Sequence, residues 1–182
     1  MGDIVFADII KQDSKDALKA LKKLGIAKTV MMTGDKEEIA KDIASKAGID
    51  TVYSRLMPDE KANIVSELQK NGSTVVYTGD GINDAPVLSQ ADVGVAMGGA
   101  GSDIAVEASD MVIMGDSLSK LAIGKKVAKK TIRIVHENII FAIAVKLLII
   151  IGCAIGIFDE NAMWLAVFGD VGVCLIAIAN SL

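Results

Sequence analysis

At 182 residues and a mean hydropathy of +0.46, the chain is long enough for one folded core but too apolar for an ordinary soluble domain of its size. Its net charge of −4 and isoelectric point near 5.0 exclude the basic footprint of a nucleic-acid-binding protein, so no nucleic-acid partner is expected. Its only cysteines, Cys153 and Cys174, lie in the apolar C-terminal part, which argues against a disulfide framework or a CxxC metal site.

Short apolar runs alternate with helical patterns along the first part of the chain. Strands are expected at residues 4–7, 29–32, 51–53, 73–77, 93–96 and 111–114. Helices are expected from Ser14 to Gly25, around 39–47, from Pro58 to about Gln69, after Pro86 and near 104–108. This alternation predicts an α/β fold with a doubly wound parallel sheet that is covered on both faces.

Polar side chains follow three of these strands. They are Asp8, Thr33-Gly34-Asp35 and the segment from Asp80 to Asp84. In an open parallel sheet, ligands bind outside the carboxyl ends of the strands, so the three segments are expected to converge on one edge.

The segment from Thr78 to Pro86 carries the strongest chemical signal. Asp80 and Asp84 lie four residues apart in a glycine-containing loop that enters a helix, so their carboxylates are candidate Mg²⁺ ligands. Asn83 and backbone N–H groups would then contact phosphate oxygens. The alternative is a plain strand-to-helix turn with an aspartate cap.

Lys61 and Thr33 are further candidates for contact with a phosphoryl group. Lys61 follows Pro58-Asp59-Glu60 at a helix start, where an ammonium would neutralise phosphoryl charge, and the Thr33 hydroxyl would donate to the same group with Asp35 nearby. Taken singly, Lys61 is a solvated lysine and Thr-Gly-Asp an ordinary turn. Gly94 and the glycines after it indicate tight backbone geometry, because their spacing does not fit a dinucleotide fingerprint.

Residues 118–137 predict a basic helix that leads directly into an apolar hairpin. Residues 138–158 and 162–179 are each close to the roughly 20 residues that a membrane span needs, and 159–161 form a polar turn between them. Lysines precede the first span, so the soluble part is expected in the cytosol. The basic residues are Lys120, Lys125, Lys126, Lys129, Lys130 and Arg133.

Lys146 and Asp170 each lie near the middle of one expected span. A charge at that depth costs about 2.5 to 3.5 kcal/mol even on the lenient insertion scale, so the two side chains are expected to neutralise one another. One interpretation is a structural salt bridge that holds the hairpin. The functional one is an ion pathway, with Asp170 as cation ligand and Lys146 as its counter-charge.

Together these strings resemble the P-type ATPases, and among them the heavy-metal exporters of the zinc, cadmium and lead branch. The matching strings are Met32-Thr33-Gly34-Asp35, Pro58-Asp59-Glu60-Lys61, Thr78 to Pro86, and Ala91 to Gly98. The resemblance implies a partial, haloacid-dehalogenase-like phosphorylation domain at 1–117, the basic juxtamembrane helix at 118–137, and the last two-helix transmembrane hairpin at 138–182. It also implies location in a membrane, most simply the plasma membrane of a prokaryote.

By this resemblance, Asp80 coordinates Mg²⁺, Lys61 and Thr33 contact the phosphoryl group, and Asn83 and Asp84 complete the site. Asp170, with Lys146 in the preceding helix, matches the Zn²⁺/Cd²⁺/Pb²⁺ branch. Copper exporters would show a Tyr-Asn pair and Met-x-x-Ser-Ser, and the cobalt type His-Glu-Gly, none of which occurs here.

The departure from the family is equally informative. The chain has no Asp-Lys-Thr-Gly, whose aspartate is phosphorylated, and no Cys-Pro-Cys helix. ATP would bind through absent domains, so the chain alone is expected to be inactive, with a bilayer and the remaining pump domains, or a complementary N-terminal fragment, as partners. Its sheet would lack the nucleophile-bearing strand. The alternative function is a non-catalytic membrane-anchored regulator of a partner pump, while a soluble phosphatase is disfavoured by the absent nucleophile and the hairpin.

Overall fold

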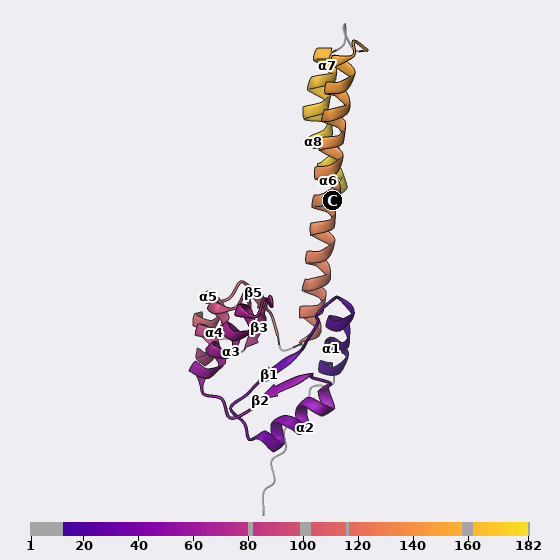
Figure 1. Ribbon diagram of the computed structural model, residues 1–182. Coiled ribbons are helices and arrows are strands. Elements are labelled where there is room, and N and C mark those ends of the chain that lie inside the picture. The colour runs from indigo at the N-terminus through magenta and orange to yellow at the C-terminus, as the bar shows by residue number, and fades with distance from the viewer. Residues whose placement is uncertain (1–12, 80–81, 99–102, 116, 158–161, 182) are drawn as a thin grey trace, which may run out of the picture. The chain divides into compact units, whose positions relative to one another are not determined.

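The computed structural model describes residues 13–79, 82–98, 103–115, 117–157 and 162–181, and the chain divides into two compact units between Gly124 and Lys125 (Figure 1). Each unit is described by itself. The strand expected at 4–7 and the candidate Asp8 lie outside the described residues, as do Asp80 and the turn at 159–161.

The first unit begins with a helix pair on a two-stranded parallel sheet. Helix α1 (Ser14–Lys23) is followed by strand β1 (Val30–Met32), helix α2 (Glu37–Ala47) and strand β2 (Thr51–Tyr53). Val30 lies opposite Thr51 in the parallel register. Helix α2 ends where sequence predicted, at Gly48, whose φ of +80° is a left-handed cap that glycine adopts without strain.

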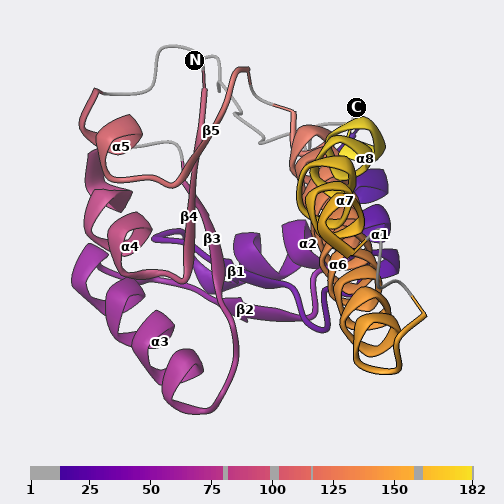
Figure 2. The same ribbon diagram turned by 90° about the horizontal axis from the view of Figure 1, so that it is seen from above.

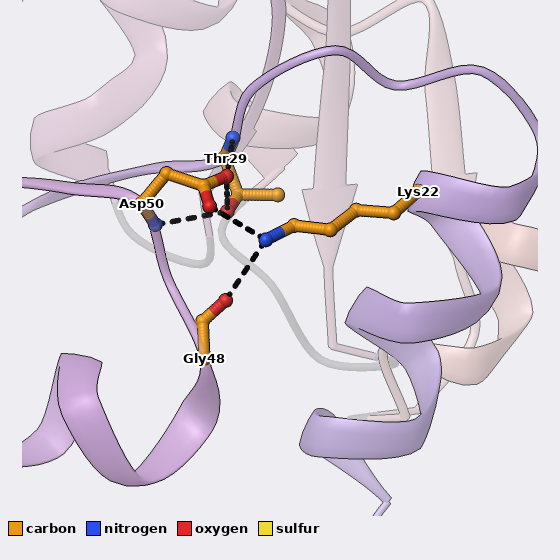
Figure 3. Close-up of polar contacts among 4 residues, drawn as sticks. All are labelled: Lys22, Thr29, Gly48 and Asp50. Atoms are coloured by element: carbon orange, nitrogen blue, oxygen red, sulfur yellow. Dashed lines mark hydrogen bonds and ion pairs between the residues drawn. The ribbon is translucent and has the colours of Figure 1, made fainter.

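A polar network joins α1 to the turn that follows α2 (Figure 3). Lys22 Nζ donates to Asp50 Oδ1 at 2.6 Å and to the Gly48 carbonyl at 3.2 Å. Asp50 Oδ2 accepts from the backbone N–H of Thr29 at 2.8 Å and from its hydroxyl at 2.7 Å. These contacts fix where β1 begins relative to the end of α2.

The rest of the first unit is a three-stranded parallel sheet with helices beside it. The strands are β3 (Val76–Gly79), β4 (Val93–Met97) and β5 (Met111–Ile113), in that spatial order. The helices are α3 (Pro58–Lys70), the short 3₁₀ turn η1 (Ile82–Asp84), α4 (Ala85–Gln90) and α5 (Asp103–Glu107). Figure 2 shows α3, α4 and α5 gathered on one side of this sheet.

A single apolar cluster packs these helices onto the sheet. Its members are Val65, Tyr77, Val87, Leu88 and Ala105. Val65, Val87 and Leu88 are fully buried. Met32, at the end of β1, packs against the same cluster, so the carboxyl end of the first sheet lies beside the core of the second.

The α/β class with parallel strands is confirmed, but the strands form two sheets where one was expected. Sheet β1-β2 and sheet β3-β4-β5 share no strand pairing within the described ranges.

The second unit is a pair of long apolar helices. Helix α6 begins at Ser119, within the first unit, and continues without a break to Ala154. A second helical run comprises α7 (Ala162–Val167), the π-helical turn η2 (Phe168–Gly172) and α8 (Val173–Ser181). Both runs are long and apolar enough to cross a membrane, which confirms the expected apolar hairpin helices.

Candidate functional site

The loop between β3 and α4 places Asp84 in a buried position. Asp84 ends η1, is 8% exposed, and is followed by α4 with Pro86 in its first turn. Proline is favoured there because the N–H that it lacks would have no partner inside the helix. Asn83, the other candidate in η1, is exposed.

Asp84 pairs with Lys61 across 23 residues of sequence. Lys61 Nζ lies 2.8 Å from Asp84 Oδ1, and both side chains are largely buried, at 18% and 12% exposed. The hydroxyl of Tyr77 donates to the same oxygen at 2.9 Å. One carboxylate oxygen therefore accepts from an ammonium and a phenol.

The start of α3 explains the position of Lys61. Pro58 occupies the first turn, and Glu60 Oε2 accepts the backbone N–H of Met57 at 2.7 Å, which caps the helix. Val65, one turn beyond Lys61, is fully buried in the core cluster. The Pro-Asp-Glu-Lys string thus sets where the helix begins, and the core fixes which face carries Lys61.

Gly79 lets the loop fold closely onto Asp84. A Cβ added at Gly79 would lie 2.8 Å from both Cβ and Oδ2 of Asp84, closer than real Cβ contacts allow. The absence of a side chain at Gly79 is therefore a geometric requirement for the position of Asp84.

Thr33-Gly34-Asp35 forms a second tight loop after β1. The Thr33 hydroxyl donates to Asp35 Oδ2 at 2.7 Å and accepts the backbone N–H of Asp35 at 3.1 Å. The Thr33 carbonyl accepts the N–H of Leu56 at 3.0 Å, and the Asp35 carbonyl accepts that of Arg55 at 2.9 Å. The loop is thus tied to the segment that leads into α3.

Thr33 and Asp35 are not joined directly to Asp84. Across the described residues, no hydrogen bond or ion pair links the Thr33-Gly34-Asp35 loop to Lys61 or Asp84. The two loops are related through the packing of Met32 on the Tyr77 cluster. The structure therefore unites Lys61 with Asp84 and leaves Thr33 in a neighbouring loop.

Lys146 and Asp170 form an ion pair between the two apolar helical runs. Lys146 Nζ lies 2.8 Å from Asp170 Oδ1. Asp170 lies in the π-helical turn η2. The π-helix is rare in proteins, and where it occurs it is often found at a functional site. Beside Asp170, a Cβ added at Gly169 would lie 2.6 Å from Ile149 Cδ1, so the glycine permits close approach of α6.

Three polar residues that make these contacts are not predicted from the sequence. Tyr77 fits an apolar strand, and its hydroxyl is the one available signal, because a buried phenol needs a polar partner. Asn138 and Asn180 lie in apolar helices, where Asn180 Nδ2 donates to Asn138 Oδ1 at 2.9 Å between the helical runs. In the described part of the chain, no cluster of three metal-ligating side chains is found.

Comparison with known proteins places this arrangement in a family. The family model described as haloacid dehalogenase-like hydrolase matches residues 1–92. The chain belongs to the haloacid dehalogenase-like hydrolase family. The matched region includes the candidate residues Thr33-Gly34-Asp35, Lys61 and the whole Thr78–Pro86 segment.

Relatives extend the similarity over the whole chain. The cadmium, zinc and cobalt-transporting ATPase of Bacillus subtilis (strain 168) is 47% identical over 100% of this chain and 26% of the relative. The zinc-transporting ATPase of Synechocystis sp. (strain ATCC 27184 / PCC 6803 / Kazusa) is 46% identical over 99% of this chain and 25% of the relative. The chain thus spans about a quarter of the length of these curated relatives.

A solved structure shows the same relation. The crystal structure of a zinc-transporting PIB-type ATPase in the E2.Pi state aligns with a TM-score of 0.87 and 32% identity, covering 96% of this chain and 28% of that one. These similarities confirm the resemblance to heavy-metal P-type ATPases. They do not favour the alternative of a separate regulatory protein, because the match includes both the α/β unit and the apolar helices.

Proposed function

We propose that this chain supplies one half of a phosphoryl site and one intramembrane metal ligand to an ATP-driven exporter of Zn²⁺, Cd²⁺ or Pb²⁺. The observation that carries the proposal is the coexistence of two ion pairs in one chain, one largely buried in the α/β unit and one between the apolar helical runs. Lys61–Asp84 lies beside the loop after β3, and Lys146–Asp170 lies between apolar helices. The names of the relatives support zinc and cadmium as the transported ions.

The contacts of the residues in the α/β unit support the roles proposed for them. The ammonium of Lys61 lies beside the loop that follows β3, where it would offset the negative charge of a phosphoryl group during its transfer. Asp84 anchors that ammonium. The Thr33 hydroxyl and the N–H groups around Gly34 are the donors of the neighbouring loop, with Asp35 fixing the hydroxyl.

Mg²⁺ suits the oxygen donors of this loop. Asp84 supplies a carboxylate that packs against Gly79, and Asp80 and Asn83 supply further oxygens in the same sequence segment. Asp80 and Asp84 would hold the ion. When bound, Mg²⁺ neutralises charge on phosphate oxygens.

The remaining assignments belong to the same proposal. The domains are 1–117 for the partial phosphorylation domain, 118–137 for the basic juxtamembrane helix and 138–182 for the hairpin. The α/β unit faces the cytosol of a prokaryote, since basic residues precede the first span. ATP and the phosphorylated aspartate are contributed by other domains or by a complementary fragment.

The test is a chimera in which this chain replaces the matching quarter of the Bacillus subtilis relative. Asp170→Ala should remove zinc stimulation of ATP turnover, while phosphorylation of the enzyme by inorganic phosphate is retained. Glu137→Ala is the matched control, because Glu137 is an acidic residue of the same unit whose partner Arg133 lies on its own helix. Unaltered zinc dependence in Asp170→Ala would overturn the assignment of Asp170.

A further inference from the structure

Tyr77 places a buried hydroxyl in an otherwise apolar cluster. Its side chain belongs to the core cluster with Val65 and Leu88, and the residue is 9% exposed. A phenylalanine ring would pack in the same place, so packing alone does not require the hydroxyl. The hydroxyl instead donates to Asp84 Oδ1 at 2.9 Å.

Asp84 is held from two directions as a result. Oδ1 accepts from Tyr77 and from Lys61, while Oδ2 and Cβ lie against the open side of Gly79. These contacts on both sides restrict the rotation of the Asp84 carboxylate. Because an ammonium has three N–H donors and only one is directed at this oxygen, Lys61 keeps donors for a second anionic partner.

We propose that Tyr77 is a positioning residue of the phosphoryl site, whose hydroxyl fixes Asp84 so that Asp84 presents Lys61 to the phosphoryl group. The inference rests on the proposed function for the identity of that group. The hydrogen bonds that link Tyr77, Asp84 and Lys61 do not depend on the proposed function, because they are a property of these three side chains alone. Loss of the hydroxyl leaves the Asp84 carboxylate free to rotate and Lys61 free to follow it.

The coupling is tested on the full chain in detergent micelles, without any enzymatic activity. Tyr77→Phe should increase the rate at which an amine-acylating reagent modifies Lys61 several-fold, as measured by mass spectrometry. Lys22, which is held by Asp50, should react at its wild-type rate in the same sample and so report an intact fold. Tyr53→Phe removes a tyrosine hydroxyl from an exposed residue of β2 and is the matched control.

The consequence for the reaction is tested in the chimera with the Bacillus subtilis relative. Because a hydrogen bond to a charged group is lost, Tyr77→Phe should lower kcat for metal-stimulated ATP hydrolysis by roughly tenfold. The KM for ATP should stay within about twofold, since the change affects the phosphoryl site and not uniform substrate binding. A purely structural role would lower the amount of folded enzyme without this split.

The outcomes separate the two proposals. An active chimera in which Tyr77→Phe keeps wild-type kcat, or unchanged Lys61 labelling in the full chain, would overturn the role of Tyr77. A chimera without metal-stimulated turnover, combined with faster Lys61 labelling, would instead contradict the proposed function and leave the positioning of Lys61 by Tyr77 in place.

Discussion

Asp50 is a carboxylate whose pKa is strongly lowered by its hydrogen-bond partners. The hydrogen bond from Lys22 and those from the N–H and hydroxyl of Thr29 hold the pKa of Asp50 well below its usual range (Figure 3). A lowered folded pKa stabilises the fold above the pKa of an unfolded aspartate, about 4. That contribution is lost as the pH falls from about 4 through the lower pKa of the folded chain.

We therefore expect Asp50→Asn to reduce the acid sensitivity of the fold. In the wild-type chain, the urea midpoint should fall as the pH decreases from about 5 to about 3, and this fall should be shallower in Asp50→Asn. Asp16→Asn is the control, because Asp16 makes only an exposed contact of 3.8 Å with Lys19. Equal slopes in the wild type and Asp50→Asn would contradict the assigned role of the network.

Gly94 gives a second prediction at a single residue. A Cβ added there would lie 2.3 Å from the carbonyl oxygen of Leu88 and 2.9 Å from its carbonyl carbon, both backbone atoms that cannot rotate away. Gly94→Ala should therefore destabilise the chain by about 1–3 kcal/mol, the usual cost of overpacking.

Urea unfolding of the full chain in micelles measures this cost. Gly34→Ala is the matched control, since its added Cβ would make only an ordinary contact of 3.5 Å with the Leu56 carbonyl. A Gly94→Ala variant as stable as Gly34→Ala would show that α4 and β4 separate more easily than their close approach indicates.

The sequence predicted individual site residues where a charged side chain occurred at a fixed place in a recognisable motif. Lys61 and Asp84 were both named as candidates, and the structure brings them within 2.8 Å of one another. Their pairing was not predicted, because which face of α3 points at the loop depends on the burial of Val65 in the core. Tyr77 was not predicted at all, since a tyrosine in a short strand also suits plain apolar packing.

At the scale of elements, the helix ends were the most predictable features. Gly48 ends α2 and Pro58 opens α3, as their backbone preferences require. Strand β3 begins at Val76 although 73–77 was expected, because pairing with β4 starts at Val93, opposite Val76. The π-helical turn η2 was not predicted, since the pattern of apolar residues does not distinguish a π-helix from an α-helix.

The two apolar helical runs are also joined by amide hydrogen bonds near the end of the chain. Asn138 Nδ2 donates to the Ala177 carbonyl and to Ser181 Oγ, both at 3.1 Å. Asn180 Nδ2 returns a hydrogen bond of 2.9 Å to Asn138 Oδ1. Three interhelical hydrogen bonds thus depend on Asn138.

Asn138→Leu should weaken the association of the two helices by about 1–2 kcal/mol, because interhelical hydrogen bonds in membranes contribute amounts of this order. The measurement is the unfolding midpoint of the hairpin in mixed micelles with rising dodecyl sulfate. Thr131→Val is the control, since the Thr131 hydroxyl donates only to the Val127 carbonyl of its own helix. If Thr131→Val lowers the unfolding midpoint as much as Asn138→Leu does, the loss cannot be attributed to hydrogen bonds between the helices.

At the scale of the whole chain, the division into two parallel sheets is the main departure from the expected single sheet. Strands β1 and β3 each pair on one side only within the described ranges. An unpaired strand edge leaves N–H and C=O groups to water. The alternation in the sequence predicted parallel strands, but it did not predict that β1-β2 and β3-β4-β5 would pair as separate groups.

The unpaired edges predict a difference in amide exchange between the chain alone and the chimera with the Bacillus subtilis relative. In the 182-residue chain, amides on the free edges of β1 and β3 should exchange rapidly, while those of the central strand β4 stay protected on both sides. In the chimera, the free-edge amides should become protected if, as the proposed function requires, the remainder of the relative contributes a strand that pairs with both edges. Equal exchange at β1 and β3 in both proteins would mean that these edges are already paired in the isolated chain, or that the relative contributes no strand between them. Either result would contradict the proposal that the relative completes a split sheet.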